Sequence, residues 1–198
     1  MSKILVTFVS MAGSTAEIAT SIGNSLGEVG HSVDVAPIRS VEDLQGYDAI
    51  VVGGPMILGW HREARRFLRS HKSVLGTIPF AIFATAMSLT QPEQDRIDGI
   101  PVFIDEKLAK PPADPSRPVL RERYASLTNY VRPIRRSAHP VKPVSIAFFG
   151  GRLNYGRLKW WAVLFAMLLV RAQAGDKRNW DAINQWAHEL PKQLGLVR

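Results

Sequence analysis

A short run of hydroxyl-bearing and small residues near the N-terminus could bind an anion. The run is Ser10-Met11-Ala12-Gly13-Ser14-Thr15, and it follows an apolar segment, residues 3–9, that is typical of a strand buried on both faces of a parallel sheet. After it, Ile18, Ile22 and Leu26 recur at helical spacing. A turn from strand to helix presents free backbone N–H groups, the positive end of the helix dipole and hydroxyl donors. The pattern therefore predicts a cradle for a phosphate group.

Other interpretations of this turn compete. Neither a Walker A loop nor a Gly-x-Gly-x-x-Gly dinucleotide fingerprint occurs in the sequence. Ser14 or Thr15 could instead cap the helix and do nothing else. Two observations favour the phosphate: the first βα turn of an α/β sheet is the usual ligand site, and no Lys or Arg occurs between Lys3 and Arg39. A loop without cations nearby suits an anion that is held by backbone dipoles.

The elements that would position the turn alternate between strands and helices. Apolar runs predict strands, and helical spacing predicts helices at about 14–29, 61–75, 118–134 and 180–190. The strands are expected at residues 3–9, 31–36, 47–53, 78–84 and 144–149. Short connections between such units indicate an α/β fold of three layers, with a doubly wound, five-stranded parallel sheet. The length of 198 residues favours a single domain over residues 1–198.

Two stretches depart from this regular pattern. Residues 91–118 contain six prolines and read as a long excursion, in which residues 100–108 fit a short strand or a short helix equally well. Residues 157–172 form a basic apolar helix pattern with Trp160 and Trp161 at its start. Its eleven-residue apolar run would span only about 16 Å against a bilayer core of about 30 Å, so it cannot cross a membrane. It could instead pack in the core or a dimer interface, or lie in a membrane interface.

Composition and charge exclude several kinds of site. The sequence has no cysteine, which removes disulfides, thiolate nucleophiles, iron–sulfur clusters and Cys-based zinc sites, and suits a reducing cytoplasm. The histidines show no metal-ligand spacing, so no metal is expected. The net charge of +8 is uneven: residues 1–60 hold two basic and six acidic side chains, and residues 144–198 hold eight and three. This asymmetry suits a membrane or an acidic partner, or simply a solvated face, and no nucleic-acid motif accompanies it.

The loops after three predicted strands should meet at one edge of the sheet. In a doubly wound sheet the ligand binds outside the carboxyl ends of the strands, where the strand order reverses. There the Ser10–Thr15 turn would meet the loop at residues 54–60, which is rich in large apolar side chains, and the loop at residues 85–90. A phosphate needs N–H and hydroxyl donors, a flat ring needs apolar walls, and a polar ring edge needs backbone hydrogen bonds. The three loops offer what FMN requires.

The sequence resembles the flavodoxin superfamily, and within it the flavodoxin-like, menaquinone-dependent protoporphyrinogen IX oxidases. The resemblance covers most of the chain. It rests on Ser10–Thr15 with Glu17-Ile18-Ala19, on residues 47–53, on Gly59-Trp60-His61 leading into Phe67 and His71, and on Gly151-Arg152-Leu153-Asn154-Tyr155 with the 157–171 helix and Trp180-Asp181. The coupling of a flavodoxin turn to a basic, tryptophan-bearing helix points to the oxidase branch. The resemblance implies a flavodoxin-like fold with strand order 2-1-3-4-5.

The same resemblance assigns roles to the three loops. Ser10, Gly13, Ser14 and Thr15 would hold the phosphate of FMN, with Met11 and Ala12 in the same turn, where Ala12 replaces the usual Thr. The loop at residues 54–60 would flank the isoalloxazine ring of FMN, and the loop at residues 85–90 would contact the edge of that ring. The candidate cofactor-binding residues of these two loops are Pro55, Met56, Ile57, Leu58, Gly59 and Trp60, and Thr85, Ala86, Met87, Ser88 and Leu89.

The implied activity is that of a flavin-dependent oxidoreductase, which takes electrons from a protoporphyrinogen-like substrate and passes them to a quinone. No catalytic side chain is assigned. His61 is the nearest candidate, but a role at a helix start or in packing competes with it. The alternatives are a flavodoxin-type electron carrier, an NAD(P)H:quinone reductase, and a non-redox interaction protein on the same fold. A cytoplasmic protein is expected, with peripheral membrane contact through Trp160, Trp161 and their basic neighbours, or a homodimer, as alternatives.

Overall fold

A parallel sheet forms the centre of the molecule. The computed structural model describes all residues except 58, 91–95, 115, 154–174 and 197–198. Its main sheet has seven strands in the order β2-β1-β3-β4-β9-β7-β6. The five predicted strands are β1 (Lys3–Phe8), β2 (Ser32–Pro37), β3 (Ala49–Pro55), β4 (Phe80–Ala86) and β9 (Ser145–Gly150). They are parallel to one another and follow the expected order 2-1-3-4-5, which confirms the predicted fold class.

Side chains alternate along each central strand, so each of these strands contributes to an apolar cluster on each face of the sheet. In β3, Ala49 and Val51 face one apolar cluster, and Ile50 and Val52 face the other. All four are fully buried. Continuous apolar runs are the sequence pattern of such two-sided strands. This pattern makes β1, β3, β4 and β9 recognisable, whereas β2, at the sheet edge, shows an alternation of polar and apolar residues.

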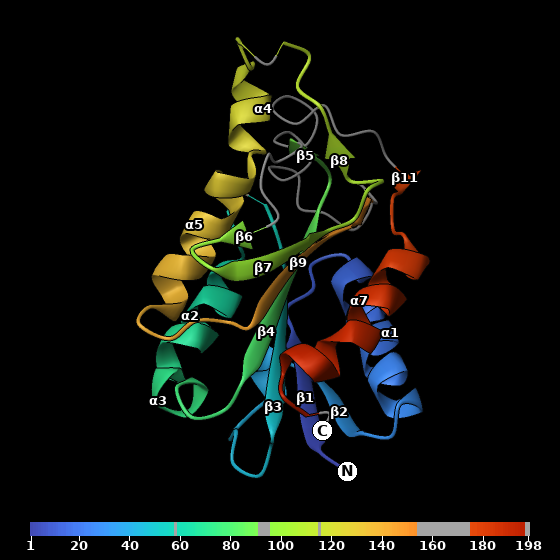
Figure 1. The fold of residues 1–198 in the computed structure, drawn as a ribbon, viewed down its shortest axis with the longest axis vertical. Helices are drawn as coiled ribbons and strands as arrows, with labels where there is room; N and C mark the ends of the chain where they lie inside the picture. Colours follow the sequence, from blue (N-terminus) through green and yellow to red (C-terminus); the bar gives the residue numbers. More distant parts are fainter. Residues whose placement is uncertain (58, 91–95, 115, 154–174, 197–198) are drawn as a thin grey trace.

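Helices cover the two faces (Figure 1). One face is covered by α1 (Ser14–Glu28) and α7 (Trp180–Gln193), whose buried side chains join the cluster of β3 residues Ala49 and Val51. The other is covered by α2 (Arg62–Ser70), α3 (Lys72–Leu75) and α5 (Leu127–Ala138), which pack on the cluster of Ile50 and Val52. The helix starts near β1 and β3 therefore lie beside the strand ends that carry the predicted site.

Two helical expectations need correction. The predicted 61–75 helix divides at His71 into α2 and α3. The predicted 118–134 helix divides into α4 (Leu120–Tyr124) and α5, because Ser126 takes an extended conformation and its Oγ accepts a bond from the backbone N–H of Asn129, 3.4 Å away. Between β2 and β3 the chain makes only a short 3₁₀ helix, Ile38–Ser40.

The proline-rich excursion adds strands to the sheet. Residues 100–104, left open between strand and helix by the sequence, form β7 (Ile100–Ile104), which pairs parallel with β9 and antiparallel with β6 (Arg96–Ile97). A separate small pair joins β5 (Leu89–Thr90) to β8 (Ala109–Lys110), above the carboxyl ends of the main strands (Figure 1). The described part of the excursion thus extends the sheet edge and pairs with the third predicted loop at Leu89.

The C-terminal part is described on both sides of a gap. Strands β10 (Arg152–Leu153) and β11 (Gly175–Asp176) pair antiparallel. The predicted basic apolar helix at 157–172, with Trp160 and Trp161, lies outside the described residues. Within the parts of the chain that the structure describes, every helix is too short or too polar to span a bilayer.

Candidate functional site

The turn after β1 has the geometry of an anion cradle. Gly13 precedes α1 with φ of 95°, a left-handed conformation that favours glycine. The Oγ of Ser10 accepts a hydrogen bond from the N–H of Gly13 at 3.0 Å, which closes the turn. Among the described residues no side chain caps the start of α1, so Ser14 and Thr15 are not helix caps. The first N–H groups of α1 and the hydroxyl of Ser14 thus remain available to a ligand.

A cavity of about 50 Å³ brings the three predicted loops together at this turn. The Oγ1 atoms of Thr15 and Thr85 lie 3.0 Å apart and join the first loop to the third. The loop after β9 completes the wall with two residues that we had not predicted, Gly151 and Arg152. The predicted residues that line the cavity are Met11, Ala12, Ser14, Thr15, Pro55, Met56, Ile57, Thr85, Ala86 and Met87.

Of the other predicted site residues, Ser10 and Trp60 line a second cavity beside this one, and further ones support the loops from behind. Trp60 is 1% exposed and its Nε1 donates to the carbonyl of Gly54 at 3.2 Å, so it packs in the core under the second loop. Leu89 is fully buried in the same core. The backbone N–H of Gly59 and the carbonyl of Ser88 bind side chains of a later segment. Leu58 lies outside the described residues.

Two tyrosines after the excursion hold the second and third loops. The hydroxyl of Tyr124 accepts a bond from the N–H of Gly59 at 3.1 Å, and the hydroxyl of Tyr130 donates to the carbonyl of Ser88 at 3.1 Å. The two rings meet edge to face with centroids 6.3 Å apart. Burial raises the pKa of Tyr130, so this hydroxyl remains a donor. These two contacts join segments far apart in the sequence, so no local pattern indicates them.

Charged residues gather at the rim beside the start of α1. Arg152 donates to a carboxylate oxygen of Glu17 at 2.8 Å, and Arg178 binds both Glu17 and Asp176. Arg178 and Arg152 hold the pKa of Glu17 below its usual value, so this carboxylate stays charged but is neutralised by two guanidinium groups. The sequence around the turn has no Lys or Arg between Lys3 and Arg39. The fold brings Arg152 there from the end of β9.

The residues around the cavity fit FMN. The small cavity, with the hydroxyls of Ser14 and Thr15 and the start of α1, has donors suited to the phosphate. A Cβ built on Gly151 would lie 3.8 Å from Ser14 Oγ, so a side chain here would occupy the approach to the turn. The ring would lie outside the cavity, between Pro55–Ile57 and Thr85–Met87. Among the described residues no group of His, Asp and Glu side chains could hold a metal ion.

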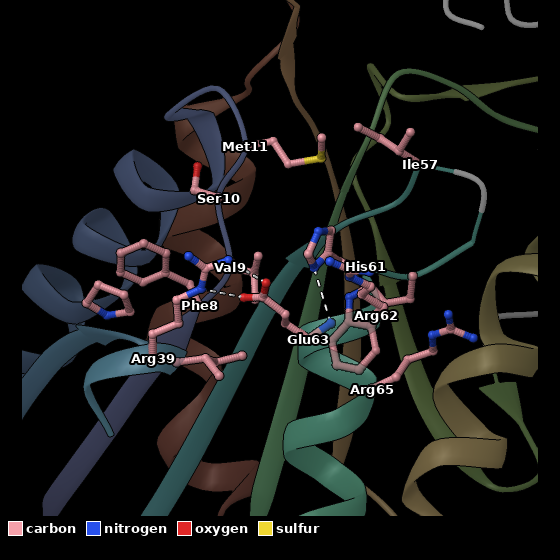
Figure 2. Close-up of a pocket in the computed structure, with 13 residues that line it drawn as sticks. Phe8, Val9, Ser10, Met11, Arg39, Ile57, His61, Arg62, Glu63 and Arg65 are labelled. Carbon is pink, nitrogen blue, oxygen red and sulfur yellow. Dashed lines mark hydrogen bonds and ion pairs between the residues drawn. The ribbon is translucent and has the colours of Figure 1, made fainter. Parts of the chain in front are cut away.

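A larger cavity of about 700 Å³ lies beside the small one and shares Met11 and Ile57 with it (Figure 2). His61 stands at its rim, at the start of α2, and its Nδ1 accepts a bond from the backbone N–H of Glu63 at 3.3 Å. The predicted role of His61 at a helix start is therefore confirmed. Burial lowers the pKa of His61, which keeps the imidazole neutral near pH 7.

Comparison with known proteins identifies the family. A family model described as "Flavodoxin domain" matches residues 5–179. This chain belongs to the flavodoxin family. A curated relative, protoporphyrinogen IX dehydrogenase [quinone] of Escherichia coli K12, is 22% identical over 95% of this chain and 94% of its own length.

Solved flavodoxins share the fold. A short-chain flavodoxin associated with a bacterial microcompartment aligns over 98% of this chain and 99% of its own with a TM-score of 0.53 and 12% identity. A Streptococcus pneumoniae TIGR4 flavodoxin aligns over 96% and 99% with a TM-score of 0.50 and 14% identity. Family and fold together show an FMN-binding protein with a flavin oxidoreductase or electron-transfer role. The predicted cofactor is thereby confirmed, while the contact residues stay a prediction.

Proposed function

We propose that this flavodoxin-family protein is an enzyme that passes electrons from a reduced, protoporphyrinogen-like substrate to a quinone through FMN. The observation that carries the proposal is the 700 Å³ cavity that shares Met11 and Ile57 with the predicted phosphate cavity. An electron carrier needs to hold only its flavin, whereas an enzyme also needs space for a reactant beside it. The similarity to the E. coli dehydrogenase over nearly the whole chain supports the same substrate and acceptor.

The protein's own contribution is to hold and orient the cofactor. Bound FMN would supply the redox chemistry, accepting a hydride at N5 and releasing the electrons to an acceptor. Ser14, Thr15 and the start of α1 would bind its phosphate. Arg152 would add positive charge at the rim while it neutralises Glu17. No acid or base of the protein is assigned to the reaction.

Two other interpretations lead to different measurements. A flavodoxin-type electron carrier or an NAD(P)H:quinone reductase would use the same cofactor site with other partners, and a non-redox interaction protein would have lost FMN binding. A single domain over residues 1–198 and a cytoplasmic location also belong to the proposal. Contact with the membrane through Trp160 and Trp161, or a homodimer through the same segment, stays a prediction because residues 154–174 lie outside the described ones.

The test is turnover of the FMN-loaded protein with matched pairs of reactants. Protoporphyrinogen IX with a menaquinone analogue is compared with NADPH and the same quinone, and with protoporphyrinogen IX and a ferredoxin-type one-electron acceptor. The proposal expects the first pair to turn over fastest. Faster turnover with NADPH would indicate a quinone reductase, and exclusive use of the one-electron acceptor would indicate a carrier.

A further inference from the structure

The larger cavity combines apolar walls with a polar rim. Apolar side chains from the end of β1, from the 3₁₀ helix after β2 and from the loop after β3 form its walls, among them Phe8, Ile38 and Ile57. The rim is formed by the start of α2, with His61 and Glu63, and by Arg39 opposite (Figure 2). A flat apolar molecule with a polar atom at its edge suits such a cavity.

His61 presents one defined hydrogen-bond donor to this space. Because Nδ1 accepts the N–H of Glu63, the neutral imidazole must carry its proton on Nε2. Figure 2 shows the imidazole between the start of α2 and Met11, with Nδ1 on the side of α2. The described residues offer Nε2 no hydrogen-bond partner. His61 lines the larger cavity, so a ligand oxygen there could accept a hydrogen bond from Nε2–H.

The charged pair at the rim contributes little net charge. Arg39 binds Glu63 through two bonds, Nε to Oε2 at 3.0 Å and Nη2 to Oε1 at 2.6 Å, and Arg39 holds the pKa of Glu63 below its usual value. Each group neutralises the other. Arg62 is exposed, and Arg65 extends away from Arg39 in Figure 2. Beside this pair the rim carries no net charge, whereas Arg62 and Arg65, which also line the cavity, add positive charge on the side of α2.

We propose that the larger cavity binds the quinone, with His61 Nε2–H donating a hydrogen bond to one quinone oxygen and Ile38 packing against the ring. This inference rests on the proposed function, because it assigns a place to the acceptor of that reaction. The shared wall of Met11 and Ile57 puts such a quinone next to the predicted FMN site. His61 acts as a specificity-determining residue, and its hydrogen bond to Glu63 fixes the orientation of the donor.

The experiment measures menadione binding by calorimetry in the oxidised, FMN-loaded protein. His61→Asn keeps a side-chain oxygen that can cap α2 but cannot place a donor at the position of Nε2. It should weaken menadione binding about threefold to tenfold, the usual value of one neutral hydrogen bond. Ile38→Trp fills the cavity and should abolish binding. The matched control is His71→Asn at the other end of α2, which should leave the affinity unchanged.

FMN affinity is measured in every variant, which separates this inference from the proposed function. Unchanged FMN affinity with lost menadione binding supports the assignment. Loss of FMN binding in Ile38→Trp would show that the cavity holds the flavin, and would overturn it. Saturable menadione binding that neither variant affects, or no menadione binding by the wild type, would also overturn the assignment. Binding of protoporphyrin IX, but not menadione, with the same dependence on His61 would assign the cavity to the other reactant and would also overturn it. If FMN fails to bind the wild type, the proposed function fails, while menadione binding to the flavin-free protein still tests the cavity.

Discussion

A single negative charge at Ser14 should expel FMN while leaving riboflavin binding nearly intact. Ser14 is 8% exposed and lines the cavity assigned to the phosphate. A carboxylate in Ser14→Asp would lie about 4 to 5 Å from a bound phosphate, where two unit charges repel by about 3 to 4 kcal/mol at an effective dielectric constant of about 20. The phosphate carries more than one charge, so FMN affinity should fall more than about 100-fold.

The control variant is Ser14→Asn, which has nearly the shape of Asp but no charge. Both variants are titrated with FMN and with riboflavin by quenching of flavin fluorescence, and circular dichroism verifies that both fold. The ratio of FMN to riboflavin affinity should fall in Ser14→Asp and remain close to that of the wild type in Ser14→Asn. An equal loss for both flavins in Ser14→Asp would mean that the phosphate does not lie at this turn.

Three further predictions concern the support of the site and are measured by urea unfolding. Tyr130→Phe removes the hydroxyl that binds the third loop and should lower the free energy of unfolding by about 1 kcal/mol. An unchanged free energy of unfolding would mean that this hydrogen bond does not stabilise the fold. Gly150→Ala places a Cβ 2.0 Å from the backbone carbonyl oxygen of Lys177 and should lower the free energy of unfolding by about 1 to 3 kcal/mol. The control Gly27→Ala, where a Cβ meets open space, should leave this free energy unchanged or raise it. Arg178→Gln should lower the free energy of unfolding at neutral pH. The difference in this free energy between wild type and variant should shrink as the pH falls through the lowered pKa of Glu17, because protonated Glu17 has no charge to pair. A difference that does not change with pH would refute the ion pair.

The parts of the fold that could be predicted are those with a local signal. Strands such as β3 were recognisable because every side chain is buried, so the sequence is continuously apolar. The Ser10–Thr15 turn was recognisable because a buried strand, small hydroxyl residues and a helix pattern follow one another. The order of strands followed from the resemblance, since the residues of one strand do not specify its neighbour.

The parts that could not be predicted depend on contacts between distant segments. Arg152 and Glu17 are 135 positions apart, and no local pattern shows that they form an ion pair. Trp60 is predicted beside the ring, and the sequence does not show that its indole N–H binds the carbonyl of Gly54 while the residue also lines the larger cavity. The same limit applies to β7, where one proline and four apolar residues fit two conformations until β9 is placed beside them.

The measurement that tests the proposed activity most directly is anaerobic mixing of the FMN-loaded protein with protoporphyrinogen IX. The visible absorbance of the oxidised flavin should bleach as the substrate transfers its electrons, and it should return when a quinone is added. Control mixing with NADPH should leave the absorbance unchanged within the same time. If NADPH bleaches the flavin and protoporphyrinogen IX does not, the proposed substrate is wrong.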